Sequence, residues 1–448
     1  MEYEDRLSAL GPEFFTRSRH ISALPADDTM VVEVHYSVDS HFVVLMSRNR
    51  ISSPRRASRD TDHLITLAQA LNASGSRVED RYWERLIEAA VGKLLRTGQD
   101  AAIEAALDHL LETDPSSSEV LLELCETLSE STTLEKDGQR YDVLLIVAPI
   151  AVWTRYSIPA GKIKTAALDA LHAQLHGHIL ARDAQLALIP RLLSIDHMPL
   201  TFSATQQWMQ RLGLQALGRN TTQKPTLPDV QDIPNMLADS RYLVGAVAVP
   251  EGAPIFRWQE SPGDELASRE TCRAQWVNQV EPTLATLLPG CGLDILLPDA
   301  WYVGAREADR SVRPLAIRAA VGWLSATLDT EPEQLRAIVA ATGETHAQEY
   351  RIGFTLRNRN EVLYGCVWPV FGPDDIPTPR DGETPPEPQD HIADLLRAEG
   401  VTDIRRLAGL LPPDFCEDCG APYFPDPTGE MVHAEMPEDA DTAPAHFH

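Results

Sequence analysis

The stretch Val143-Leu-Leu-Ile-Val-Ala148 is a run of apolar residues without a polar interruption. Such a run lacks the alternation of a half-exposed strand and is typical of a strand covered on both faces. It also marks a change of hydrophobic period, because the residues upstream of about 131 repeat at helical spacing. The chain therefore passes from helical to α/β organisation close to Tyr141.

Downstream of this strand, helical and strand patterns alternate twice, and a polar segment at 218–234 separates the two halves. The expected strands lie at about 143–148, 185–195, 242–249 and 293–297, and the expected helices at about 165–182, 204–217, 265–287 and 314–328. This order predicts two tandem βαβα units with helices packed on a mixed sheet. The fold class is therefore α/β, with α+β as the alternative, and duplication of the unit is a hypothesis.

Upstream of the sheet, the pattern predicts a module of four helices. Leu64, Leu67 and Leu71 fall on one helix face. Ser76-Arg-Val-Glu79 and Ser116-Ser-Ser-Glu119 are capping boxes, in which a hydroxyl and a carboxylate satisfy the first amides of a helix. The module resembles helical-hairpin repeat units but has too few of them for a solenoid.

A β-hairpin is expected at the end of the core. Apolar residues alternate with polar or small ones over 350–356 and again over 362–370, and Asn358-Arg-Asn360 is a turn signal. Before it, Thr330-Glu-Pro-Glu333 predicts the cap of a short helix. After it, 373–412 predicts an acidic, proline-rich linker followed by a pair of short helices.

These patterns divide the chain into five segments. They are an N-terminal arm that is poorly ordered or extraneous (1–59), the helical module (60–135), the duplicated α/β core (136–372), the linker with its short helices (373–412) and a zinc-knuckle-like tail (413–448). The composition changes abruptly at Met46, where a basic, serine-rich stretch begins. One interpretation is that residues 1–45 lie upstream of the biological start. The alternative is a genuine N-terminal arm.

The composition is that of a soluble globular protein, with 43% hydrophobic and 23% charged residues. A net charge of −27 opposes non-specific attraction to nucleic acid and to anionic membranes. No apolar run is long enough for a membrane span, and no signal peptide is recognisable. Four of the six cysteines stand apart among apolar residues, which fits a reducing compartment. We therefore expect a cytoplasmic protein.

The tail contains Cys416-Glu-Asp-Cys-Gly420, which has the spacing of half a zinc site. Acidic residues between the two cysteines disfavour a thiolate, so a metal role is favoured over a redox role. A structural zinc needs two more ligands, and the sequence offers His446 and His448, with His433 in reserve. The alternative is that Cys416 and Cys419 are reduced and bind no metal.

A charged cluster follows the strand expected at 293–297. Its arginines, Arg306, Arg310 and Arg313, are placed to face an anion in the crevice beyond the strand end, a common ligand site in α/β sheets. The alternative is a helix surface with ordinary ion pairs.

Other site signals are weaker. His172 and His176 have metal-ligand spacing but lack further ligands nearby, so boundary histidines are the simpler interpretation. The arginines between Arg48 and Arg59 have no interleaved aromatic residues, so nucleic-acid binding is unlikely. Phosphate-loop, dinucleotide, nucleophile-elbow and zinc-protease signatures are absent, and no catalytic residue is assigned.

Several stretches carry a family resemblance, namely ASGSRVEDRYW (73–83), LPDAWY (297–302), EYRIGF (349–354), CEDCGAP (416–422) and VHAEMPED (432–439). In these stretches the chain resembles a proteobacterial domain-of-unknown-function family of cytoplasmic proteins. The resemblance runs from about Met46 to His448. It implies no activity, substrate or catalytic residue.

Taken together, these features favour a cytoplasmic binding or regulatory protein with a structural zinc site, acting on a protein or small-molecule partner. The first alternative is a small-molecule enzyme that uses a crevice near Asp299–Arg313. A weaker alternative is nucleic-acid binding through the Arg48–Arg59 arm. Nothing in the sequence indicates an oligomeric state.

Overall fold

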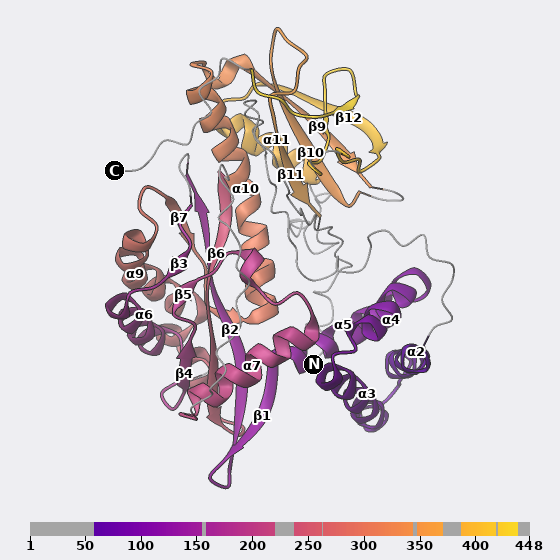
Figure 1. Cartoon of the computed structure of the whole chain (residues 1–448), viewed down its shortest axis with the longest axis vertical. Coiled ribbons are helices and arrows are strands. Elements are labelled where there is room, and N and C mark those ends of the chain that lie inside the picture. The colour runs from indigo at the N-terminus through magenta and orange to yellow at the C-terminus, as the bar shows by residue number, and fades with distance from the viewer. Residues whose placement is uncertain are drawn as a thin grey trace, which may run out of the picture.

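The computed structural model describes residues 58–154, 158–219, 237–261, 263–343, 347–370, 387–417 and 420–437. In these residues the chain is a mixed α/β protein, as the sequence predicts (Figure 1). The predictions for residues 1–45 and for the arginines of 48–57 lie outside the described residues, as does most of the proline-rich linker. None of the helices in the described part of the chain is long and apolar enough to span a membrane.

Two long strands form the centre of the larger sheet. They are β2 (Gln139–Trp153) and β6 (Ala238–Pro250), which pair antiparallel over almost their whole length. The apolar run of the sequence lies in β2. Its alternate residues face opposite cores, since Leu145 and Val147 join one buried cluster whereas Ile146 and Ala148 join another. The predicted two-sided burial is confirmed.

The flanking strands show how the two units combine. Strand β4 (Gln185–Leu188) pairs with β6, whereas β7 (Gly292–Ile295), β8 (Asp299–Ala300) and β1 (Ser131–Lys136) pair with β2. The expected order of strands and helices in both units is confirmed, but the mixed sheet is wrong, because all the pairings described in this sheet are antiparallel. Each unit places its second strand beside the first strand of the other unit. The order β7-β2-β6-β4 is that of two interlocking split βαβ units, as in ferredoxin-like folds.

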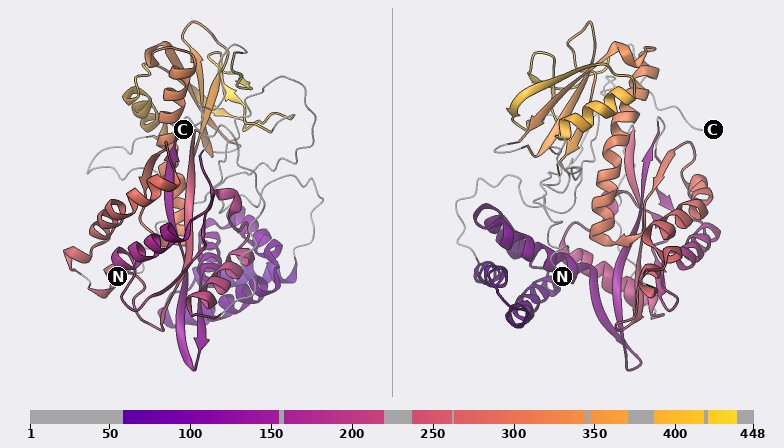
Figure 2. Two further views of the ribbon diagram at one scale, coloured as in Figure 1. Left: turned by 60° about the vertical axis from the view of Figure 1, so that its left-hand side comes forward. Right: turned by 180° about the vertical axis from the view of Figure 1, so that it is seen from behind.

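Helices cover both faces of this sheet, which is seen nearly edge-on in the left view of Figure 2. The first helices of the two units, α6 (Thr165–His178) and α9 (Arg269–Leu287), pack together over one face. The second helices, α7 (Phe202–Ala216) and α10 (Trp301–Thr327), pack over the other. The units are therefore equivalent in layer as well as in order.

The four predicted helices upstream of the sheet are present as α2 (Arg59–Asn72), α3 (Arg77–Thr97), α4 (Asp100–Thr113) and α5 (Pro115–Glu130). The Ser76 hydroxyl accepts the Glu79 amide, as expected. The second predicted box is wrong, because α5 begins two residues earlier, with Asp114 in place of Ser116 as its cap and Pro115 at its first position. We call α2–α5 the helical module.

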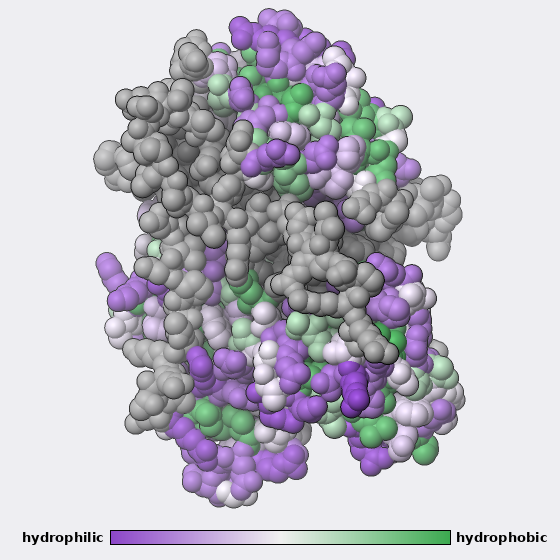
Figure 3. Space-filling model, turned by 45° about the vertical axis from the view of Figure 1, so that its right-hand side comes forward, coloured by the Kyte–Doolittle hydropathy of each residue, from purple (hydrophilic) through white to green (hydrophobic). Residues whose placement is uncertain are grey.

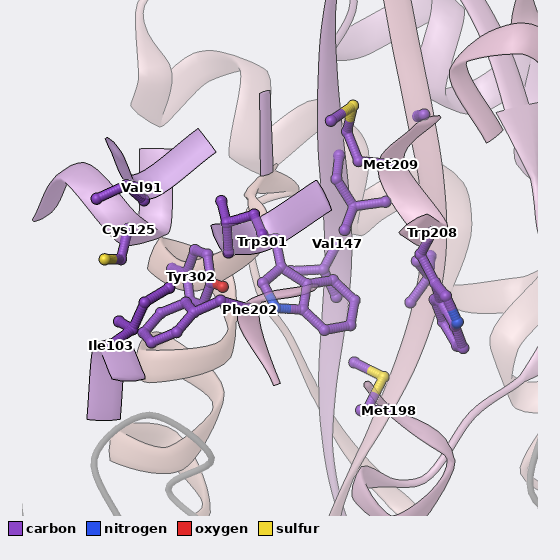
Figure 4. Close-up of a cluster of buried hydrophobic side chains, with 14 of the residues drawn as sticks. Val91, Ile103, Cys125, Val147, Met198, Phe202, Trp208, Met209, Trp301 and Tyr302 are labelled. Atoms are coloured by element: carbon purple, nitrogen blue, oxygen red, sulfur yellow. The ribbon is translucent and has the colours of Figure 1, made fainter. Parts of the chain in front are cut away.

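The helical module shares its core with the sheet. Val91, Ile103 and Cys125 from the module belong to the same buried cluster as Val147 of β2 and Trp301 of α10 (Figure 4). The aromatic side chains of α7 and of the start of α10 fill the space between them. The module is therefore held in place by apolar contacts, which are the main stabilising term in folding.

A second, smaller sheet has the order β11-β10-β9-β12. It comprises β9 (Leu335–Thr342), β10 (Glu349–Leu356), β11 (Tyr364–Pro369) and β12 (Asp403–Leu411). The predicted hairpin is confirmed as β10 and β11, but it belongs to this sheet and not to the duplicated core. Helix α11 (Pro388–Ala398) and the second half of α10 cover one face of it.

Two short helices were predicted wrongly in this region. The segment after Thr330 forms only the 3-10 turn η4 (Pro332–Gln334) and then continues as β9. The segment after Thr402 is not a helix but β12, which pairs parallel with β9. Tertiary pairing with β9 overrides the helical propensity of its leucines and arginines.

The remaining elements are short. They are β3 (Gly161–Lys162), β5 (Arg191–Leu192), β13 (Phe424–Pro425), β14 (Met431–Val432), α8 (Arg257–Glu260), η2 (Ile195–His197) and η3 (Glu265–Ala267). Strands β13 and β14 pair in the tail, where Phe424 is buried against the smaller sheet. A Cβ on Gly365 of β11 would come within 2.3 Å of the Phe424 ring, so this position needs glycine.

Candidate functional site

The loop that carries Cys416 is a tight reverse turn. The Cys416 amide donates to the Ala421 carbonyl, and the Gly420 amide donates to the Cys416 carbonyl, both at 2.8 Å. Gly420 has φ 73°, a left-handed conformation that favours glycine. Phe415 and Pro422 form an antiparallel bridge below the turn. The backbone thus folds back on itself, as the sequence predicts for a metal-binding knuckle.

A buried arginine anchors the base of this loop. Arg351 of β10 is fully buried, and its Nη1 donates to the carbonyls of Asp414 and Tyr423 on either side of the loop. Its Nε donates to Glu349 at 2.7 Å, and its guanidinium lies 4.8 Å from the Phe415 ring centre. Arg351 was not predicted from the sequence. Its only sequence signal is a charge within a strand whose neighbours are apolar.

The predicted metal ligands lie only partly within the described residues. Cys419, His446 and His448 lie outside them. Of the other two, Cys416 is partly buried, and His433 follows β14 with its Nδ1 3.8 Å from the Glu435 carboxylate. In the ranges that the structure describes, no group of three or more potential ligands gathers around a point. The zinc-binding part of the fold prediction is therefore not supported, and the metal site stays a prediction.

The arginines of the charged cluster lie in α10, which begins at Trp301 and contains Pro314. The expectation that a helix opens at Pro314 is therefore wrong, and residues 301–313 are the first half of the helix. Arg306 makes a two-pronged ion pair with Glu126 of α5, at 2.8 and 3.0 Å, and both side chains are nearly buried.

The other two arginines point to different surroundings. Arg310 lies 3.8 Å from Glu307 one turn earlier. Arg313 is buried, donates to the Pro369 carbonyl at 2.8 Å and lies 5.4 Å from the Trp368 ring centre. The three arginines thus contact α5, their own helix and β11 respectively. Their role as an anion site stays a prediction.

Three carboxylates lie near the first turn of α10, of which Glu126 and Asp299 are buried and Glu130 is partly buried. Glu130 of α5 accepts the Tyr302 amide at 3.0 Å, at the positive end of the helix. The pKa of Glu130 is raised to about 8, chiefly by burial and also by the nearby Glu126 and Asp299 carboxylates, against the opposing effects of the Tyr302 amide and Arg306. Glu130 therefore holds a proton near neutral pH. The Asp299 carboxylate forms an ion pair with Arg269 of α9.

A serine and a histidine lie in contact near β5. The Ser194 hydroxyl is 2.7 Å from His197 Nδ1, and Arg191 Nη2 is 3.4 Å from His197 Nε2. Both Ser194 and His197 are buried. The contact closes the 3-10 turn η2, for which Ser194 is the cap. We therefore interpret this pair, which the sequence analysis missed, as a structural one.

The outer face of α3 carries an exposed apolar row. Val78, Tyr82 and Leu86 follow one another at four-residue intervals and are 80%, 50% and 39% exposed. Figure 3 shows hydrophobic residues among hydrophilic ones at the lower right, where the helical module comes forward. Ile87 and Val91 lie on the opposite side of the helix and are buried. The helix therefore has two apolar sides, of which only one is used for folding.

A row of arginines runs beside the exposed apolar row. Arg77, Arg81 and Arg85 each precede one of its members and are exposed. Among the residues that the structure describes, none of these three arginines has an acidic side chain within ion-pair distance. The other flank of the apolar row is different, because Glu79 there approaches the Trp83 indole nitrogen at 3.4 Å. This face of α3 was not predicted from the sequence.

Comparison with known proteins places the chain in a family but gives no activity. No curated protein and no solved structure matches it. The family described as protein of unknown function (DUF2863) matches residues 49–447, a span that includes every described residue. The expected domain-of-unknown-function family is thereby confirmed, whereas its proteobacterial origin stays an expectation. The chain belongs to the DUF2863 family.

Proposed function

We propose that this chain is a cytoplasmic binding or regulatory protein that recognises a protein partner through the outer face of α3. The observation that carries the proposal is the exposed row of Val78, Tyr82 and Leu86. Contiguous apolar surface with a polar border marks interaction sites on soluble proteins. A helix that leaves one apolar side uncovered presents a surface against which the apolar face of a partner segment packs.

The alternative enzyme site near Asp299–Arg313 has less support. An enzyme needs polar groups that converge on a common space. Arg306 is engaged with Glu126 and Arg313 with the Pro369 carbonyl, so neither is directed to a shared ligand position. The nucleic-acid alternative is also weaker, because the net charge of −27 opposes a polyanion.

We also propose that the tail holds a structural zinc through Cys416 and Cys419, with His446 and His448 as partners and His433 in reserve. The tight turn at Cys416 and its anchoring by Arg351 support this, since a metal site gains from ligands held in place before binding. Four protein ligands leave no position for water, so the role is structural. Elemental analysis of untagged protein should give one zinc per chain, and none in the Cys416→Ser, Cys419→Ser double variant. Substoichiometric zinc that is equal in both proteins would contradict the site.

The binding surface can be tested by crosslinking in the native host. A photoreactive residue placed at Tyr82 should give a discrete crosslinked product with one partner. The matched control is a photoreactive residue at Leu266, which is 75% exposed but isolated in η3. Crosslinks at position 82 should disappear when Val78 and Leu86 are both changed to serine, because the apolar row is then broken. Equal labelling at both positions would show that α3 has no special role.

A further inference from the structure

We infer that the partner segment is an amphipathic α-helix with a row of carboxylates beside its own apolar row. This inference rests on the proposed function of α3, whose apolar surface it provides with a specific occupant. It follows from the geometry of the two rows, from their charge and from the exclusion of a second copy of the chain.

The geometry comes from the four-residue spacing. Val78, Tyr82 and Leu86 form one i, i+4 ridge, and Arg77, Arg81 and Arg85 form the ridge next to it. Helices pack by placing the ridge of one into the groove of the other. A partner helix that inserts apolar residues between these two ridges brings its flanking side chains next to the arginines. An i, i+4 row on the partner therefore matches the arginine row residue by residue.

The positive charge of the arginine row indicates which side chains the partner helix carries beside its apolar row. Each of the three arginines is followed three residues later by an acidic residue, namely Asp80, Glu84 or Glu88. These carboxylates lie on the side of the arginine row away from the apolar row, and none is within ion-pair distance of an arginine among the described residues. Among unmodified protein side chains, carboxylates are the groups that arginine binds best, because the planar guanidinium matches them with two hydrogen bonds. The acidic side chain near the apolar row, Glu79, lies on the other flank beside Trp83. The partner's carboxylates must therefore lie on one side of its apolar row.

A second copy of this chain fits the surface poorly. In an antiparallel two-fold helix pair the same flanks meet, so the arginine row of one copy would face the arginine row of the other. In a parallel pair the three arginines would face the flank of Glu79, which supplies one carboxylate. Like charges in direct contact weaken association and suppress wrong partners. An anionic membrane is disfavoured by the net charge of −27.

The test uses the full chain and two synthetic helical peptides that differ only in charge. Both carry leucines at four-residue spacing, flanked on one side by glutamates in the first peptide and by lysines in the second. Fluorescence anisotropy should show that the glutamate peptide binds about tenfold or more tightly than the lysine peptide, and that added salt narrows the difference. The Arg81→Glu, Arg85→Glu double variant should reverse this preference. The Arg182→Glu, Arg273→Glu double variant, which changes the same charge elsewhere on the surface, should retain it.

Three outcomes would overturn the inference. Equal binding of both peptides that is lost in Tyr82→Ser would leave the proposed surface in place but refute its preference for carboxylates. Binding that Tyr82→Ser does not change would refute the proposed surface itself. A concentration-dependent dimer in sedimentation experiments that Tyr82→Ser dissociates would show that the occupant is a second copy of the chain.

Discussion

Replacing Glu130 with glutamine should remove part of the pH dependence of folding stability. The pKa of Glu130 is raised from 4.5 to about 8 in the folded chain, chiefly by burial. Between these values the folded chain binds about one proton more than the unfolded chain. The free energy of unfolding therefore falls as the pH rises, by about 1.4 kcal/mol per pH unit. The stabilising contribution is complete below the unfolded pKa and is lost as the pH rises toward the folded pKa.

Between about pH 5 and about pH 7 this single group should reduce the stability of the wild type by about 2 to 3 kcal/mol. Glutamine does not titrate, and its side-chain oxygen still accepts the Tyr302 amide. Burial also raises the pKa of Glu104 to about 7 and of Asp108 to about 6. Their contributions are common to both proteins, so the difference between wild type and variant isolates Glu130.

Urea unfolding of the wild type and of Glu130→Gln at several pH values measures this difference. The Glu265→Gln change serves as a control, because it replaces the same type of ionisable side chain at an exposed position. The stability of Glu130→Gln relative to the wild type should increase with pH, whereas that of the control should stay constant. Parallel stability curves for Glu130→Gln and wild type would refute the reasoning, because they would mean that Glu130 is already ionised in the folded chain.

Two further variants test the packing that positions the candidate sites. Glu126→Gln should lower the free energy of unfolding by about 3 to 5 kcal/mol, since it leaves the nearly buried Arg306 guanidinium without its carboxylate. Urea unfolding should also show that the Glu126→Leu, Arg306→Met double variant recovers part of this loss. If the double variant recovers nothing, the loss is due to packing and not to charge. Gly365→Ala should detach the tail from the smaller sheet, because the new Cβ would come within 2.3 Å of the Phe424 ring. Limited proteolysis should cut the tail faster than in the wild type while the larger sheet stays protected. An unchanged cleavage rate would contradict the assigned packing.

The sequence predicts the order of helices and strands in the duplicated core, because each element has its own spacing of apolar residues. The apolar run of β2 and the helices around it are recognisable without any knowledge of their partners. The pairing of strands is not local. Hydrophobic period shows which residues are buried but not which strand lies beside them. The antiparallel, interlocking sheet therefore differs from the mixed sheet that the strand-helix alternation predicts.

Strands β9 and β12 were not predicted, because the intrinsic propensity of their residues favours a helix. Strand β9 is rich in alanine and β12 in leucine and arginine, all of which favour helices in isolation. They form strands because each supplies backbone hydrogen-bonding groups to the other. Strand β12 also shifts register between Arg406 and Leu410, where Gly409 has a left-handed φ of 88°. Such a bulge is decided by tertiary packing.

The candidate sites differ in how much of their structure could be predicted from the sequence. The spacing around Cys416 predicted a tight turn, and the turn is present, because Gly420 can adopt the left-handed conformation that the turn requires. The arginines of α10 lie on one helix, as their spacing allows, but their partners come from α5 and β11. For α3, the periodic residues at both sides of the helix were visible in the sequence. Which side is covered depends on the packing of the whole helical module.

The charge of the chain and the charge of α3 act at different distances, and this difference shapes how a partner binds. The net charge of −27 repels an acidic segment that approaches from afar, so electrostatic steering does not accelerate the encounter. At physiological ionic strength, charges more than about 8 Å apart are largely screened. In contact, the nearest charges on one flank of the apolar row are those of Arg77, Arg81 and Arg85. Asp80, Glu84 and Glu88 lie behind this row, farther from the partner. Association should proceed at an ordinary rate of about 10⁵ to 10⁷ M⁻¹ s⁻¹, and discrimination between acidic and basic partners should reside mainly in the rate of dissociation.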